Sequence, residues 1–201
     1  MSVDLLIATS NKGKVIEIED LFRITAVRFR SLMDFQSISE VAETGSTFEE
    51  NAVLKARGYA LQTGMMALAD DSGLEIMALE GSPGVLSARY GGDDSSFEQK
   101  MAMLLHEMIN TGDRNRDARF VCSMALASGT GEILDTSTGI CEGKIADEPR
   151  GIHGFGYDPM FIPSGFDKTF GELGDYVKCQ ISHRAHASKT IIRYLLAFMA
   201  V

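Results

Sequence analysis

The chain has few cysteines and lacks a long apolar run. Its three cysteines, Cys122, Cys141 and Cys179, are odd in number, widely spaced and form no Cys-x-x-Cys pair. This pattern argues against a disulfide framework or a zinc site and favours a reducing compartment. No stretch reaches the roughly 18 apolar residues that a membrane span requires, and no basic segment precedes the first apolar residues. We therefore expect a soluble cytoplasmic protein.

Positive charge is also scarce. Lysine and arginine total 19 against 28 aspartate and glutamate residues, which gives a net charge of −9. This field repels nucleic acids and anionic membranes, so we expect neither as a partner. A small anion would need local cations or a metal ion. The 201 residues contain only four prolines and no low-complexity linker, so we expect one folding unit.

Apolar spacing predicts strands and helices in alternating order. Strands are expected at residues 5–8, on both sides of Asp70-Asp71, and as a hairpin at 119–126 and 132–140; helices are expected at 14–23, 46–63, 96–110 and 187–199. The second helix begins with a Ser46-x-x-Glu49 capping box and ends at Gly64. Its buried face comprises Phe48, Ala52, Ala56 and Tyr59. The residues of the helix at 96–110 that are expected to face inward are Phe97, Met101, Leu104, Leu105 and Met108. The pattern is typical of an α/β fold with helices around a mixed sheet.

Two adjacent carboxylates, Asp70 and Asp71, follow the apolar run 65–69 and precede Ser72-Gly73. Like charges this close raise each other's pKa unless a metal ion, lysine or arginine compensates them. The pair therefore indicates a Mg²⁺ site or an acid/base device. Asp-Asp-Ser-Gly between two strands is also good turn chemistry, so an exposed turn stays open.

A polar loop follows the first expected strand and reads Thr9, Ser10, Asn11, Lys12, Gly13 and Lys14. Hydroxyls, an amide and two lysines at a helix N-terminus suit a phosphate, although an ordinary capped helix start explains them equally well. Farther along, Glu43 lies in a loop before the second helix, where its carboxylate could reach the same cation as Asp70 and Asp71. Lys55 follows within that helix.

A glycine-rich segment carries two aromatic residues and an acid: Gly154, Phe155, Gly156, Tyr157, Asp158 and Pro159. Glycines allow close approach of a ligand, and an aromatic ring can stack on a base. A tight turn with its aromatic rings in the core is the alternative. A local basic cluster follows at Lys178, His183, Arg184 and His186. His183 and His186 are three residues apart and could ligate a metal ion on a helix, but Mg²⁺ prefers oxygen ligands. We therefore interpret His183 and Arg184 as hydrogen-bond donors to an anionic or carbonyl-bearing ligand.

Six blocks carry these motifs in one order: residues 8–14, 43–56, 69–74, 83–90, 154–159 and 181–184. Together they resemble the inosine triphosphate pyrophosphatase family, also called the dITP/XTP pyrophosphatases. The resemblance spans nearly the whole chain. It implies that residues 1–201 form a single nucleoside triphosphate pyrophosphatase domain, with an elongated mixed β-sheet, flanking helices and two lobes around a central cleft. It also implies a homodimer.

The resemblance further implies Mg²⁺-dependent hydrolysis of deaminated purine nucleoside triphosphates to monophosphate and pyrophosphate. By position, Asp71 would be the catalytic carboxylate and a metal ligand, with Asp70 and Glu43 also at the metal. The substrate would contact Thr9, Ser10, Asn11, Lys12, Gly13, Lys14, Lys55, Ser72, Phe155, Gly156, Tyr157, Asp158, Lys178, His183 and Arg184. Many members carry two acids where this chain has Ala42-Glu43, so Glu40, or a carboxylate reached through water, stays an alternative to Glu43.

Residue chemistry and resemblance agree on attack by water at the α-phosphorus. Asp71 would help to activate the water, while Mg²⁺, Lys14 and Lys55 offset charge on the departing pyrophosphate. A 6-keto purine accepts a hydrogen bond where adenine donates one, so donors such as His183 or Arg184 would select hypoxanthine or xanthine over adenine. Two alternatives are a non-catalytic nucleotide-binding module and a metal-dependent phosphatase that releases orthophosphate.

Overall fold

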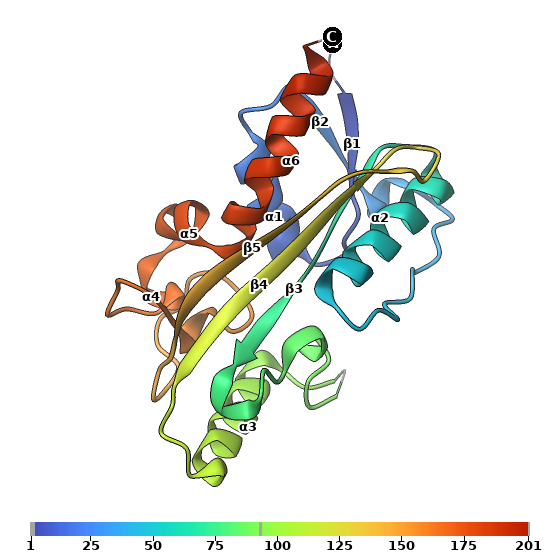
Figure 1. Ribbon diagram of the computed structural model, residues 1–201. Coiled ribbons are helices and arrows are strands. Elements are labelled where there is room, and N and C mark those ends of the chain that lie inside the picture. The colour runs from blue at the N-terminus through green and yellow to red at the C-terminus, as the bar shows by residue number, and fades with distance from the viewer. Residues whose placement is uncertain (1–2, 93, 201) are drawn as a thin grey trace. The chain divides into compact units, whose positions relative to one another are not determined.

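The computed structural model describes residues 3–92 and 94–200 and shows an α/β fold (Figure 1). Within these described residues, six strands form one sheet in the order β2-β1-β3-β4-β5-β6. β1 pairs in parallel with β2 and β3, and β5 pairs antiparallel with β6, so the sheet is mixed as predicted. The strands are β1 (Val3–Ile7), β2 (Val27–Ser31), β3 (Ala67–Ile76), β4 (Asp117–Ala127), β5 (Ile133–Ile145) and β6 (Phe161–Pro163).

The helices accompany the strands along the chain. They are α1 (Lys12–Phe22), α2 (Phe48–Thr63), α3 (Phe97–Thr111), α4 (Phe170–Leu173), α5 (Asp175–Ile181) and α6 (His183–Met199). The connections contain the short 3-10 helices η1 (Leu32–Asp34), η2 (Met77–Leu79), η3 (Gly84–Leu86) and η4 (Asp158–Met160). Within the described residues, no helix combines the length and apolarity needed to cross a membrane.

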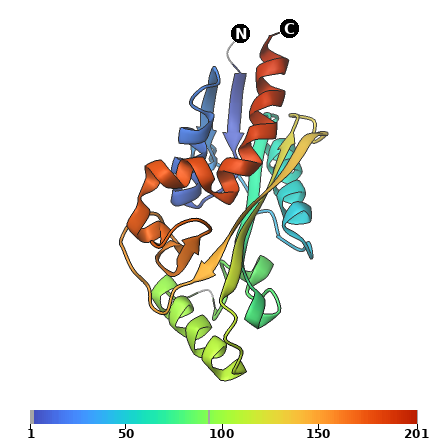
Figure 2. The ribbon, with the colours of Figure 1, turned by 60° about the vertical axis from the view of Figure 1, so that its left-hand side comes forward.

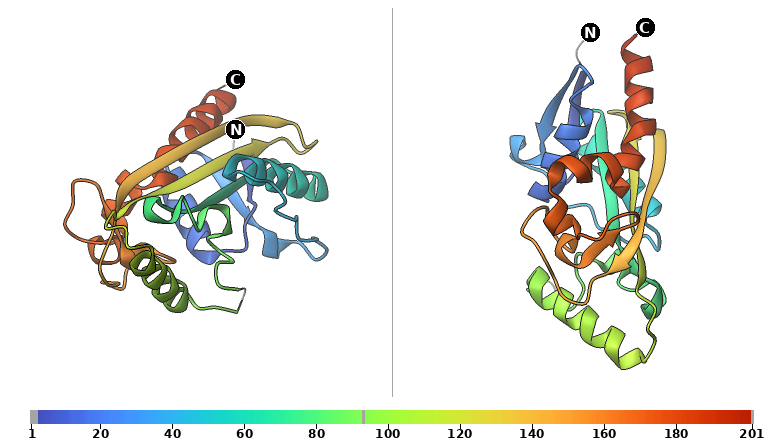
Figure 3. Two further views of the ribbon diagram at one scale, coloured as in Figure 1. Left: turned by 60° about the horizontal axis from the view of Figure 1, so that its bottom comes forward. Right: turned by 90° about the vertical axis from the view of Figure 1, so that its left-hand side faces the viewer.

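The chain divides into two compact units. The first unit holds the described residues up to Asp71, then Cys122–Gly139 and the residues from His183 onward. The second unit holds Ser72–Val121 and Ile140–Ser182. The strands β3, β4 and β5 each contribute to both units, and the hairpin of β4 and β5 is the long pair in Figure 3. The boundary falls directly after Asp71, so the predicted site residues belong to different units.

In the first unit, helices cover both faces of the strands. One face packs against α1 and α6 (Figure 2). On this face Leu5, Ile7 and Leu68 belong to the same buried cluster as Ile18, Phe22 and Ile191. The other face packs against α2, with Leu6, Ala67 and Ala69 against Ala52, Ala56 and Tyr59. The buried face predicted for α2 is therefore confirmed. Gly64 also ends this helix as predicted, in the left-handed conformation that glycine adopts without a steric penalty.

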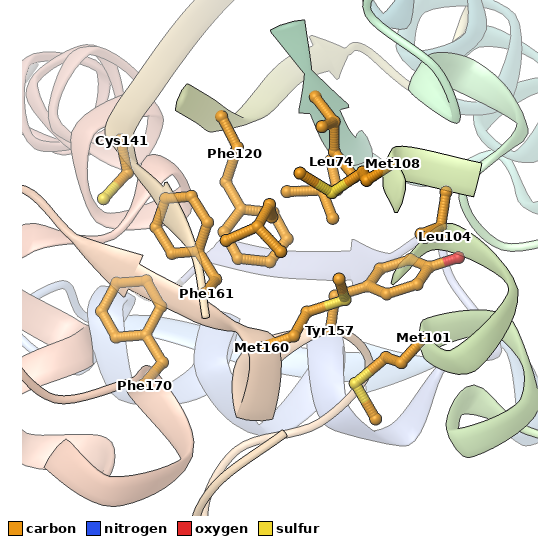
Figure 4. Packing of buried hydrophobic residues seen from close by; sticks show 13 residues of the cluster. Leu74, Met101, Leu104, Met108, Phe120, Cys141, Tyr157, Met160, Phe161 and Phe170 are labelled. Atoms are coloured by element: carbon orange, nitrogen blue, oxygen red, sulfur yellow. The ribbon is translucent and has the colours of Figure 1, made fainter. Parts of the chain in front are cut away.

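The second unit has its own core, built largely from aromatic and sulfur-containing side chains (Figure 4). Phe161 lies between Phe120 and Phe170, with ring centroids 4.5 Å and 5.6 Å away. Met101, Leu104 and Met108 of α3 face this cluster, which confirms the inward face predicted for most of that helix. Phe97, also predicted to face inward, lies at its exposed end.

Two features near the site residues differ from expectation. The strands expected on either side of Asp70-Asp71 are one strand, β3, which runs unbroken through both residues and through Ser72-Gly73, so the exposed turn that stayed open as an alternative does not form. The capping box of α2 lies one residue later than predicted, with Thr47 as N-cap and Glu50 as its partner. The Glu50 carboxylate accepts hydrogen bonds from the backbone N–H groups of both Ser46 and Thr47, at 2.7 and 3.2 Å, which places the box at this register.

The boundaries of other helices and strands also differ from the predicted ones. The last helix, α6, begins at His183 rather than at residue 187, so His183 and Arg184 lie in its first turn. The strand β2 and the helix α5 were not predicted. In β2, arginines alternate with valine and phenylalanine over only five residues, and α5 has only seven residues. Both patterns are too short for periodicity alone to identify.

Candidate active site

The strand β3 carries Asp70 and Asp71 into two different environments within the first unit. Successive side chains of a strand point to opposite faces. Asp70 therefore lies on the face of Leu68, toward α1 and α6, whereas Asp71 lies on the face of Ala69, toward α2. Their hydrogen-bond partners differ accordingly. The two carboxylates do not share one site in the way their adjacency in sequence suggested.

Asp70 is fully buried and surrounded by cations. The Arg184 guanidinium donates to Asp70 Oδ2 from Nη2 and Nε, at 2.9 and 3.3 Å, and Lys14 Nζ lies 3.3 Å away. The Cys122 thiol is a further neighbour, with Sγ 3.8 Å from the same oxygen. Burial favours the neutral acid, but Lys14 and Arg184 outweigh it and hold the pKa of Asp70 well below its usual range. Asp70 is therefore an anion that orders two cations.

Arg184 extends this buried network to a second carboxylate. Its side chain is 1% exposed, and its Nη1 donates to Glu17 on α1. The predicted ligand-binding arginine thus links β3, α1 and the first turn of α6 inside the first unit. His183 precedes it in the same turn and is also buried.

Asp71 faces Lys55 and Asn51 of α2. Lys55 Nζ donates to Asp71 Oδ1 at 3.0 Å and to Glu43 Oε1 at 2.6 Å, so two carboxylates converge on one ammonium group. Asn51 Nδ2 donates to Asp71 Oδ2 at 3.2 Å. Burial raises the pKa of Asp71, and the neighbouring Lys55 and Lys14 only partly oppose it. A carboxylate in this setting is a better proton acceptor than an exposed aspartate.

Glu43 owes its place to a close contact between its loop and α2. Gly45 N–H donates to Asn51 Oδ1 at 2.7 Å. A Cβ atom on Gly45 would lie 2.6 Å from Glu50 Cβ and 2.8 Å from Asn51 Oδ1, so only glycine fits without a shift. Of the two acids considered for the metal, Glu43 contacts Lys55, while Glu40 is exposed.

The predicted phosphate loop forms the N-terminus of α1. Asn11 is the N-cap, and its Oδ1 accepts from the N–H groups of Gly13 and Lys14 at 3.0 and 3.3 Å. Thr9 Oγ1 accepts from Asn11 N–H at 3.2 Å. The capped helix start is therefore confirmed. Ser10 and Lys12 are exposed beside it, and Lys14 reaches toward Asp70.

The remaining predicted residues lie in the second unit. Asp158 is buried, pairs with Lys178 and accepts from Phe155 N–H at 2.7 Å. Lys178 Nζ lies 4.5 Å from the centroid of the Phe155 ring. Gly154 makes this turn feasible, because it has a positive φ of 70° and a Cβ there would lie 2.0 Å from Asp158 Oδ2. Gly156 also has a positive φ, and Ser72 lies half-buried on β3.

A sequence model of one family matches residues 5–194 of this chain. The chain belongs to the Ham1 family. Its relatives include proteins named dITP/XTP pyrophosphatase. One from Exiguobacterium sp. is 46% identical over 195 residues, which cover 97% of this chain and 98% of the relative. Another, from Bacillus subtilis, is 44% identical over 194 residues, which cover 96% of this chain and 98% of the relative. A HAM1 protein from Coxiella burnetii has a solved structure with a TM-score of 0.89, 40% identity, and coverage of 97% of this chain and 99% of its own. The family resemblance predicted from the six blocks is thus confirmed.

Sequence reasoning missed three polar neighbours in this Ham1 chain. Asn51 contacts Asp71, Glu17 contacts Arg184, and Cys122 contacts Asp70. Only Asn51 had a sequence signal, since it lies one helical turn before Lys55 and shares its helix face. Glu17 and Cys122 come from elements that meet β3 only in the folded structure.

The oxygen donors of the first unit suit a hard cation. Among the described residues, no three His, Cys, Asp or Glu side chains gather as a complete metal site. Mg²⁺ does not need one, because proteins usually bind it through one or two carboxylates plus substrate phosphates and water. Glu43 and Asp71 supply two carboxylates that already face one positive charge, the Lys55 ammonium. Asp70 is enclosed by Lys14 and Arg184 instead.

Proposed function

We propose that this Ham1 chain hydrolyses dITP, XTP and ITP to the nucleoside monophosphate and pyrophosphate with the help of Mg²⁺. The names of relatives that match nearly the full chain at 44% and 46% identity support the substrate class. The observation that carries the chemistry is the convergence of Asp71 and Glu43 on one positive charge in the first unit, at 3.0 and 2.6 Å.

Asp71 is proposed as the catalytic carboxylate. It would accept a proton from the attacking water, using a lone pair left by its bonds to Lys55 and Asn51. The water oxygen forms a bond to the α-phosphorus, the bond from that phosphorus to the α–β bridging oxygen breaks, and pyrophosphate leaves with the bridging oxygen. Lys14 and Lys55 would offset the charge on the leaving group. The N-terminal segment 9–13 would hold phosphate oxygens through its N–H groups and hydroxyls.

Glu43 and Asp71 are proposed to hold the magnesium ion. When bound, Mg²⁺ would neutralise charge on the phosphate oxygens and favour ionisation of a water molecule. Asp70 is proposed to act beside them by keeping Lys14 and Arg184 in place, rather than as a ligand. This assignment follows from its two cationic partners and its complete burial.

The purine is proposed to contact Phe155, through its ring, with Asp158 and Lys178 supporting that ring from within the second unit. Ser72 is proposed as a further substrate contact. His183 and Arg184 remain the proposed donors to a 6-keto oxygen, which adenine lacks.

We also propose a domain organisation, an oligomeric state and a cellular location for the protein. Residues 1–201 are proposed to act as one nucleoside triphosphate pyrophosphatase domain within a homodimer, as the family resemblance implies. All three cysteines are free thiols, which supports a location in a reducing cytoplasm.

A product assay tests the proposed function. ITP, XTP, GTP and ATP are each incubated with Mg²⁺ and then with EDTA, while pyrophosphate and orthophosphate are measured separately. We expect pyrophosphate from ITP and XTP, little from GTP or ATP, and none with EDTA. Orthophosphate as the product would indicate a phosphatase, and no turnover of any substrate would indicate a binding module; either result would contradict the proposal.

A further inference from the structure

One loop of the second unit is held by contacts from β3, from α3 and from the glycine-rich segment 154–159. Residues 83–91, named here the clamped loop, include the block 83–90 and contain the 3-10 helix η3. Ser87 lies at its centre and is buried. Its Oγ accepts from Leu74 N–H of β3 at 2.9 Å and donates to Gly84 O at 2.6 Å. The loop is therefore fixed to the strand that carries Asp71.

The helix α3 holds the part of the clamped loop that comes after Ser87. Lys100 is buried, donates to Ala88 O, and lies with Nζ 5.2 Å from the centroid of the Phe97 ring. A Cβ atom on Gly91 would lie 2.2 Å from Met103 Cε, so the Met103 side chain packs directly on the loop backbone. A buried ammonium that donates to a backbone carbonyl of this loop fixes the conformation of the loop at that point.

Tyr157 holds the same loop from the glycine-rich segment. Its side chain is 4% exposed and lies inside the hydrophobic cluster of Figure 4. The hydroxyl donates to Ser87 O at 2.8 Å, and the ring meets Phe97 edge to face, with centroids 5.2 Å apart. The ring that the sequence offered as a stacking surface is thus buried in the core.

The neighbours of Tyr157 in the chain form the proposed purine contact. Asp158 N–H donates to Phe155 O at 3.3 Å, and Phe155 N–H donates to Asp158 Oδ2 at 2.7 Å, which closes the segment into a tight turn. Asp158 also holds Lys178 below the Phe155 ring. The Tyr157 side chain extends from this turn into the core and anchors it there.

We propose that Tyr157 is a positioning residue for purine recognition, which anchors the Phe155–Asp158 turn to the clamped loop through its hydroxyl and does not itself contact the base. The inference rests on the proposed function. Without the hydroxyl, the buried Ser87 carbonyl loses its partner and the turn can shift, so the Phe155 ring and the Asp158–Lys178 pair no longer meet the purine in register. The phosphate-binding residues belong to the first unit and keep their contacts.

The variant Tyr157→Phe tests this, because it removes one oxygen and retains the ring packing. We expect the KM for ITP to rise roughly tenfold, as for the loss of one positioning hydrogen bond, while kcat stays within about twofold. Inorganic tripolyphosphate, which has no base, serves as a competitive inhibitor, and its inhibition constant should not change. General damage to the fold would alter KM, kcat and this inhibition constant together, and that outcome would overturn the inference.

Tyr176→Phe is the matched control. Tyr176 lies on α5, two residues from Lys178, and is 79% exposed, so its variant should behave as the wild type. An unchanged KM in Tyr157→Phe, with wild-type turnover of ITP, would overturn the inference alone. Absence of ITP turnover in the wild-type chain would overturn the proposed function and the inference with it.

Discussion

Replacing Asp71 by asparagine is expected to lower kcat for ITP by roughly 10²- to 10⁴-fold, the range typical of a lost general base. Asparagine keeps the size of the side chain and can still meet Asn51, but it carries no charge for Lys55 and accepts no proton. The pKa of Asp71 is raised by burial, so this carboxylate is suited to take up a proton and its amide cannot replace it. Steady-state kinetics of pyrophosphate release measure the effect.

The control for this variant is Asp113→Asn, an exposed aspartate after α3. It should retain wild-type kinetics. Thermal unfolding of Asp71→Asn should show a folded protein, since the substitution removes a buried carboxylate whose ionisation the fold disfavours. Wild-type activity in a folded Asp71→Asn protein would exclude Asp71 as the catalytic carboxylate.

Replacing Arg184 by methionine is expected to cause the largest loss of stability. The guanidinium joins Asp70 and Glu17 in the interior, and methionine leaves both carboxylates without it. Removing one partner of a buried ion pair costs about 3–5 kcal/mol of the free energy of unfolding. For a chain of this length the corresponding fall in Tm is about 6–20 °C. Differential scanning calorimetry of the wild type and the variant measures it.

Arg193→Met on the same helix is the matched control, because Arg193 is exposed. Its Tm should stay close to that of the wild type. Arg184→Lys should fall between the two, since lysine keeps the charge but loses the planar fork that reaches Asp70 from two nitrogens. Equal Tm values for Arg184→Met and Arg193→Met would show that the buried network does not hold the first unit together.

The long amphipathic helices could be predicted from the sequence with their buried faces. In α2 the residues Phe48, Ala52, Ala56 and Tyr59 repeat at helical spacing, and Gly64 supplies the stop. Local periodicity and local capping agree with the tertiary contacts of this helix, so the local pattern is sufficient to predict the helix and its buried face. The same holds for most of α3.

The strand through the aspartates could not be predicted, because its local and tertiary preferences conflict. Asp70-Asp71-Ser72-Gly73 favours a turn locally. In the folded chain, Arg184 and Lys14 neutralise Asp70, while Lys55 and Asn51 receive Asp71. These partners are distant in sequence, and their interactions outweigh the local preference for a turn.

This conflict between local turn preference and tertiary contacts also limits which features of the site could be predicted from the sequence. It named Asp71, Glu43 and Lys55, which the structure brings together in the first unit. It could not separate the two aspartates, because their opposite faces and different partners follow from an unbroken strand that the local pattern did not reveal. The local pattern also left open whether the aromatic rings of residues 154–159 stack on a base or pack into the core. For Tyr157 the answer depends on Ser87, 70 residues away.

The most direct test of the central claim is single-turnover hydrolysis of ITP in ¹⁸O-labelled water with Mg²⁺, followed by mass spectrometry of both products. Attack at the α-phosphorus with Asp71 as the proton acceptor places the label in inosine monophosphate and none in pyrophosphate. The Asp71→Asn protein should slow the labelling without moving it to another product. Label in pyrophosphate or in orthophosphate would contradict the proposed reaction.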